Sequence, residues 1–119
     1  MNKKTFLYLG VILILIILVI VIVTLATKRN IVSIQLTPDG FTPKEVRISR
    51  GQVVEFSTTT NTPFWPASNL HPTHEIYSEF DPKKPVDPKS IWEFTFHKKG
   101  SFEYHDHLAP HFRGTIIVN

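Results

Sequence analysis

The residues of this chain best suited to chemistry are its histidines. All six follow residue 70, and five of them fall into two short segments. Residues 69–75 read NLHPTHE, and residues 104–114 read YHDHLAPHFRG. Imidazole nitrogens are good ligands for copper and zinc, and a carboxylate can complete such a set. If the fold brings the two segments together, the sequence predicts a metal site made of nitrogen and oxygen ligands.

Several other kinds of function lack support in the sequence. The absence of cysteine excludes disulfides and thiolate metal ligands. There is neither the Gly-x-Ser-x-Gly elbow of a hydrolase nor a glycine loop for phosphate. The formal net charge of +3 is small, and no RNA-binding signature accompanies it. We therefore expect neither an enzyme nor a nucleic-acid-binding protein.

A long apolar segment lies near the N-terminus. Residues 6–26 contain no charged side chain, and lysine or arginine flanks the segment on both sides. A helix of this length spans roughly 30 Å, which is enough to cross the hydrocarbon core of a bilayer. A cleaved signal peptide is the alternative, but its apolar core is typically shorter, about 7–15 residues. A core helix that is apolar on every face is rare in so small a protein.

This segment predicts a single-pass protein of the cell membrane. The short positive tail before it places the N-terminus in the cytoplasm and the C-terminal domain outside. The predicted boundaries are a cytoplasmic tail at 1–5, an uncleaved transmembrane anchor at 6–27, a linker at 28–30 and one folded domain at 31–119.

The part after the anchor has the pattern of a β-protein. Charged and apolar residues alternate over 45–49 and again over 92–96, as in half-buried strands. Residues 61–90 carry six of the nine prolines, and so long a connection in a small domain is usually functional. We expect one short strand within it, at residues 75–77. Six or seven short strands of this kind favour an antiparallel sandwich.

Five short motifs in this part resemble those of the cupredoxins, the family of plastocyanin and amicyanin. In chain order they are FTP at 41–43, VRI at 46–48, GQVVEF at 51–56, GSFEY at 100–104 and GTIIV at 114–118. The resemblance extends over residues 31–119. It implies an all-β, Greek-key cupredoxin-like β-sandwich, here preceded by one transmembrane helix.

The resemblance also implies where a metal would be held. The family's first histidine ligand precedes a short strand, and His74 matches that position. The other ligands come from a loop reading Y-x-C-x-x-H-x-x-M-x-G, which aligns without a gap to residues 104–114. Its cysteine, histidine and methionine positions hold Asp106, Ala109 and Phe112. Without a thiolate the blue-copper centre cannot form.

Two interpretations of this replacement are open. In one, His74, Asp106, His107 and His111 form a nitrogen and oxygen site for copper, with zinc as the alternative metal. His105 is the least expected ligand of the loop because it neighbours Asp106 on the opposite strand face, and a role for His71 stays open. In the other, the site is lost, Asp106 is a turn residue that accepts backbone N–H groups, and the domain is a metal-free interaction module.

The first interpretation predicts a membrane-anchored copper protein outside the cytoplasm. Its role would be copper binding and delivery, or electron transfer, with a redox or metal-transport partner in the membrane. Electron transfer ranks lower, because hard ligands favour Cu(II) and hinder rapid cycling.

Overall fold

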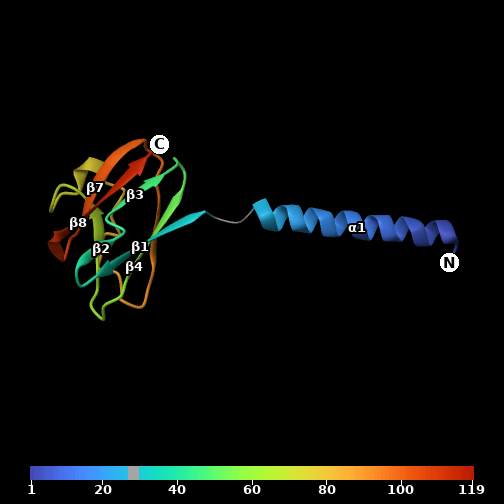
Figure 1. Cartoon of the computed structure of the whole chain (residues 1–119), viewed down its shortest axis with the longest axis horizontal. Coiled ribbons are helices and arrows are strands. Elements are labelled where there is room, and N and C mark those ends of the chain that lie inside the picture. Colours follow the sequence, from blue (N-terminus) through green and yellow to red (C-terminus); the bar gives the residue numbers. More distant parts are fainter. Residues whose placement is uncertain (27–29) are drawn as a thin grey trace.

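The computed structural model describes residues 1–26 and 30–119. Helix α1 (Lys3–Ala26) precedes a β-domain and projects away from it (Figure 1). Its length and composition are sufficient to cross a membrane, and its apolar window has no burial inside the protein. Thr27, the last residue of the predicted anchor, and most of the predicted linker at 28–30 lie outside the described residues.

The β-domain consists of two four-stranded sheets packed face to face, as the sequence predicted. The first has the order β2-β1-β4-β6, and the second has the order β3-β8-β7-β5. The strands are β1 (Ile31–Thr37), β2 (Gly40–Thr42), β3 (Glu45–Ile48), β4 (Val53–Thr58), β5 (Pro66–Ser68), β6 (Trp92–Thr95), β7 (Gly100–Asp106) and β8 (Ala109–Val118).

Both sheets mix parallel and antiparallel pairs. β1 runs parallel to β4, and β3 runs parallel to β8. The remaining strand pairs are antiparallel. The expectation of an antiparallel sandwich was therefore wrong for these two strand pairs, which are parallel. The two parallel pairs arise because the chain changes sheets between β2 and β3 and again between β3 and β4.

The core between the sheets is rich in aromatic side chains. Phe56, Phe80 and Tyr104 are fully buried near its centre, with ring centroids 5.5–5.6 Å apart. The alternating aromatic residues predicted to face inward from 92–96 also join this cluster. Burial of large rings on alternate positions stabilises the sandwich and places their polar neighbours outside.

The long connection between β4 and β6 is largely ordered by backbone hydrogen bonds. It contains β5, the 3₁₀ helix η1 (Glu75–Tyr77) and a bridge between Phe64 and Val86. The predicted strand at 75–77 is therefore wrong. The backbone at His74 adopts a left-handed conformation (φ 55°) that turns the chain, and the N–H of Tyr77 then donates to the Ser68 hydroxyl at 3.0 Å.

Candidate metal centre

Four histidines converge beside the second sheet. Their candidate ligand nitrogens all lie within 4.8 Å of one another and belong to His71, His74, His105 and His107. Two pairs approach closely. His71 Nδ1 lies 3.1 Å from His105 Nε2, and His74 Nε2 lies 2.9 Å from His107 Nδ1. These four residues are called the histidine cluster below.

The pairing of β5 with β7 brings the two histidine segments together. His105 is next to last in β7, opposite Ala67 of β5, and His107 lies in the turn that follows β7. Beyond β5 the chain stays on β7, since the Asn69 N–H donates to the Glu103 carbonyl at 3.1 Å. The loop from β5 to η1 thus lays His71 and His74 over the end of β7.

Two histidines of the cluster are oriented by oxygen acceptors. His74 Nδ1 lies 2.7 Å from Asp81 Oδ2, and His105 Nδ1 lies 2.9 Å from Asn69 Oδ1. Because both oxygens accept, each Nδ1 carries its proton and each Nε2 presents a lone pair to the cluster. Histidines that bind metals in proteins are commonly held in this way.

Asp81 is itself fixed by several donors. Its carboxylate accepts the Trp65 indole N–H at 2.8 Å and the Lys83 backbone N–H at 2.7 Å, in addition to His74. Burial would raise the pKa of this carboxyl, but the hydrogen bonds from His74, Lys83 and Trp65 outweigh burial and lower it. The side chain is therefore a buried carboxylate at neutral pH, suited to holding a histidine in one tautomer.

His107 is held by contacts with Trp65. The two rings lie 4.4 Å apart between centroids, and the His107 backbone N–H donates to the Trp65 carbonyl at 2.8 Å. Trp65 therefore contacts the cluster directly through His107, and it is linked to His74 through Asp81. The roles of Asn69 and Asp81 were not anticipated, because no spacing in the sequence relates them to the histidines.

The environment keeps at least two imidazoles neutral. Burial, followed by repulsion from His74, His71, His107 and Arg113, lowers the pKa of His105 to about 4. Burial followed by repulsion from His74 and His71 also lowers the pKa of His107. Only a neutral imidazole can coordinate a metal, so these groups can bind at pH 7 without first losing a proton.

The spacing of the cluster suits a four-coordinate metal. Ligand nitrogens about 2.0–2.1 Å from an ion lie about 2.8–3.4 Å from their neighbours in square-planar or tetrahedral geometry. The two close pairs, at 2.9 and 3.1 Å, fall within that range. Imidazole donors suit copper and zinc. The residues present therefore fit a copper or zinc ion.

The structure does not bring all four predicted ligands together. His74 and His107 belong to the histidine cluster, whereas Asp106 and His111 lie outside it. Asp106 Oδ1 accepts the backbone N–H of Trp65 at 2.8 Å, as the turn interpretation of this residue expected. His111 is exposed, and its ring packs on Phe112 with centroids 4.1 Å apart.

The three loop positions that carry ligands in cupredoxins face a separate hollow. Asp106, Ala109 and Phe112 line a hollow of about 450 Å³ whose other lining residues are Leu36, Thr37, Pro38, Thr60, Thr62, Pro63 and Leu108. Within the described part of the chain, no histidine lines it. Burial raises the pKa of the Asp106 carboxyl, against the lowering effect of the Trp65 and Leu108 backbone N–H groups.

His105 shows why the cluster lies elsewhere. His105 and Asp106 have different surroundings: His105 belongs to the histidine cluster, Asp106 lines the separate hollow, and the strand pairing shifts between the two residues. The histidines gather on the His105 face, because the loop after β5 covers that face and leaves His105 only 1% exposed. The expectation that His105 is the least suitable ligand assumed that the metal would lie on the Asp106 side of the strand.

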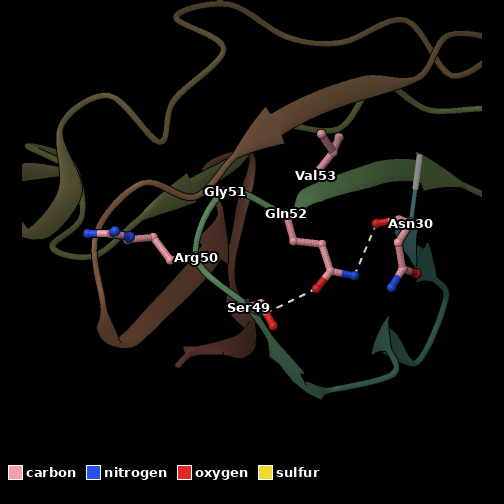
Figure 2. Close-up of a pocket in the computed structure, with 6 residues that line it drawn as sticks. All are labelled: Asn30, Ser49, Arg50, Gly51, Gln52 and Val53. Carbon is pink, nitrogen blue, oxygen red and sulfur yellow. Dashed lines mark hydrogen bonds between the residues drawn. The ribbon is translucent and has the colours of Figure 1, made fainter. Parts of the chain in front are cut away.

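A second hollow, of about 350 Å³, lies at the other end of the sandwich. Asn30, Ser49, Arg50, Gly51, Gln52 and Val53 line it (Figure 2). Gln52 closes it by donating to the Asn30 carbonyl at 3.0 Å and accepting the Ser49 N–H at 3.1 Å. Figure 2 shows the Arg50 side chain turned away from these partners. Among the described residues that line this hollow, none belongs to a group that could hold a metal ion.

The chain belongs to the cupredoxin-like domain family. The sequence profile of this family matches residues 10–118, which is nearly the whole chain. No curated protein matches the sequence significantly.

Solved structures support the same fold. Amicyanin from Paracoccus versutus has a TM-score of 0.62 at 20% identity, over 76% of this chain and 82% of amicyanin. A purple cupredoxin from Nitrosopumilus maritimus has a TM-score of 0.64 at 18% identity, over 74% and 99% of the two chains. A copper-containing nitrite reductase from Thermus scotoductus has a TM-score of 0.60 at 21% identity, over 74% of this chain and 22% of the reductase. At these identities the likeness shows the fold alone.

Proposed function

We propose that this protein binds copper at the histidine cluster and delivers it outside the cytoplasmic membrane, to which α1 anchors it. The observation that carries the proposal is the convergence of four imidazoles whose ligand nitrogens lie within 4.8 Å. The attachment of two outer nitrogens to Asp81 and Asn69 supports it, because ordinary surface histidines are not oriented in pairs toward one point.

Copper is preferred to zinc on two grounds. For a given set of nitrogen ligands, Cu(II) binds more tightly than Zn(II). Membership of the cupredoxin-like family adds support, since a fold neighbour, an amicyanin variant, is described in its reduced Cu(I) form. The ligands proposed here nevertheless differ from those implied by the family loop, because no cysteine is available.

Delivery is preferred to electron transfer because of the ligand type. Four imidazoles contain no soft thiolate or thioether to stabilise Cu(I) relative to Cu(II). In addition, the cluster lies beside the β7–β8 turn, on the side of the domain remote from the start of β1 (Figure 1). This position, with His71 exposed, leaves the cluster accessible to a partner that approaches from that side.

The membrane part of the proposal depends on α1. Its apolar length and the absence of burial against the domain suit an anchor. The lysines before it favour a cytoplasmic N-terminus. Under this arrangement the β-domain faces the exterior. Detection of the full-length chain in washed membranes, with its C-terminus accessible to external protease, tests this; a shortened, soluble product would instead identify a cleaved signal.

The copper proposal is tested by titrating the full-length protein in detergent micelles with Cu(II). We expect one equivalent to bind, with an electron paramagnetic resonance spectrum of Cu(II) coupled to four nitrogens and no intense blue absorption. His74→Ala should abolish tight binding. Failure to find a stoichiometric site at micromolar copper would contradict the proposal and favour the metal-free interaction module.

A further inference from the structure

We propose that His71 is the exchangeable ligand of the copper site, the one through which copper passes to and from a partner. This rests on the proposed copper function. It adds that the site consists of three fixed ligands and one ligand that a partner's imidazole or thioether can replace.

Exposure distinguishes His71 from the other three histidines. His74 and His105 are 3% and 1% exposed, and His107 is half-buried, whereas His71 is exposed. Its neighbours Leu70, Pro72 and Thr73 are exposed too. An incoming ligand can therefore reach the metal position from the His71 side, but not through the sheet behind His105.

The outer contacts of the imidazoles give the same distinction. His74 is tied to Asp81 and His105 to Asn69 by hydrogen bonds of 2.7 and 2.9 Å. His71 uses Nδ1 toward His105, and among the described residues its Nε2 has no hydrogen-bond partner. Its ring contacts are made only with the other histidines of the cluster. Among the described residues, no hydrogen bond or aromatic contact from outside the cluster holds this ring in place.

His107 belongs with the fixed ligands despite its partial exposure. Its ring packs on Trp65, and its backbone N–H donates to the Trp65 carbonyl. Trp65 in turn donates its indole N–H to Asp81. Rotation of the His107 ring would break its packing on Trp65, whereas rotation of the His71 ring breaks only contacts within the cluster.

These differences define a ligand substitution. The bond between copper and His71 Nδ1 breaks while a bond forms to an imidazole nitrogen or thioether sulfur of the partner. Each ligand keeps its own electron pair, so the oxidation state of copper does not change. Three imidazoles retain the ion during the exchange, and a further substitution completes transfer to the partner.

Chemical rescue by free imidazole tests this assignment. In the full-length protein with one equivalent of Cu(II), His71→Gly should reduce the nitrogen coupling from four nitrogens to three. It should also accelerate copper loss to a chelator by about 10-fold or more, as a lost ligand contact weakens such sites at least this much. Added imidazole should restore the fourth nitrogen and slow the loss, because the vacated position opens to solvent.

His105→Gly is the matched control, since it removes the same group from the buried side. Imidazole should not restore its spectrum, and His107→Gly provides a second comparison if the His105 variant unfolds. Equal rescue of all the variants that fold, or three-nitrogen binding by His71→Gly without rescue, would overturn the assignment. Failure of the unaltered protein to bind copper would instead overturn the proposed function.

Discussion

His74 Nδ1 lies 2.7 Å from Asp81 Oδ2, with both side chains almost completely buried. This hydrogen bond determines what the other ring nitrogen, His74 Nε2, presents to the cluster. Because Asp81 holds the proton on Nδ1, the lone pair of His74 Nε2 points to the cluster. The same carboxylate binds Trp65, whose ring packs on His107. A single buried aspartate therefore orients two of the four proposed ligands.

Asp81→Asn should weaken copper binding by about 10–100-fold, the range typical for loss of a partner that orients a metal ligand. The amide is nearly the same size, but it can present an N–H to His74 Nδ1 and favour the wrong tautomer. Competition titration against a chelator of known affinity measures the effect. Glu79→Gln removes a nearby exposed carboxylate and serves as the control, with unchanged affinity.

His107 and His111 provide a paired test within one loop. His107 lies in the cluster, whereas His111 is exposed and packs on Phe112. His107→Ala should lower copper affinity by at least about tenfold and remove one nitrogen from the resonance spectrum. His111→Ala should leave both measurements unchanged. If the His111 variant lost copper and the His107 variant retained it, the metal would lie at His111 and the proposed position of the site would be wrong.

Much of the β-domain could be predicted from the sequence because strand signals are local. Alternation over 45–49 and 92–96 depends only on which residues face the core, and the structure confirms it at β3 and β6. The prediction of a strand at 75–77 failed because three residues are too few to show a strand periodicity. The left-handed backbone at His74 also depends on contacts made elsewhere in the chain.

The site was less predictable because it depends on contacts between distant residues. Both histidine segments were recognised from composition, and His74 and His107 fall in the cluster. The path of the loop after β5 decides on which face of β7 the histidines gather. Contacts such as the hydrogen bond from the Asn69 N–H to the Glu103 carbonyl fix that path. The comparison with the family loop pointed to Asp106 instead. Such a comparison matches positions along the loop, but it does not show which face of β7 other segments cover.

Asp106→Asn should therefore change copper affinity by no more than about twofold, far less than the 10-fold or larger losses expected for residues that hold the metal. The amide oxygen can still accept the Trp65 N–H, so the turn should persist. The same titration applies. A loss of affinity comparable with that of His107→Ala, in a variant with an unchanged melting temperature, would restore Asp106 as a ligand.

Gly114 provides a test of the sandwich that is independent of copper. It pairs with Tyr104 across β7 and β8, and a Cβ atom added there would lie 2.5 Å from the Tyr104 Cζ atom. Since Tyr104 is fully buried among core rings, it has little room to move. Gly114→Ala should lower the free energy of unfolding by about 1–3 kcal/mol, measured by chemical denaturation. Gly51→Ala is a less suitable comparison because its φ is +87°, so Ser101→Ala, on an exposed position of β7, is the control.

The copper-free protein should lose stability in mild acid. The folded-state pKa of His105 is lowered to about 4 by burial and by its histidine neighbours and Arg113, whereas an unfolded histidine titrates near 6.5. Between about pH 6.5 and 4 the unfolded chain thus binds more protons than the folded one, and stability falls as the pH falls. The lowered pKa of His107 acts in the same direction. Copper binds only the neutral imidazoles, so the difference in melting temperature between loaded and copper-free protein should also shrink over this range.

Melting temperatures of the full-length protein in micelles, measured with and without copper from pH 7.5 to 4.5, check both expectations. His105→Asn removes one of the titrating groups and should flatten the pH dependence of the copper-free form, whatever its absolute stability. His97→Asn changes an exposed histidine outside the cluster and should preserve the slope. A copper-free melting temperature that stays level or rises on acidification would mean that His105 and His107 do not lie in the crowded environment that lowers their pKa values.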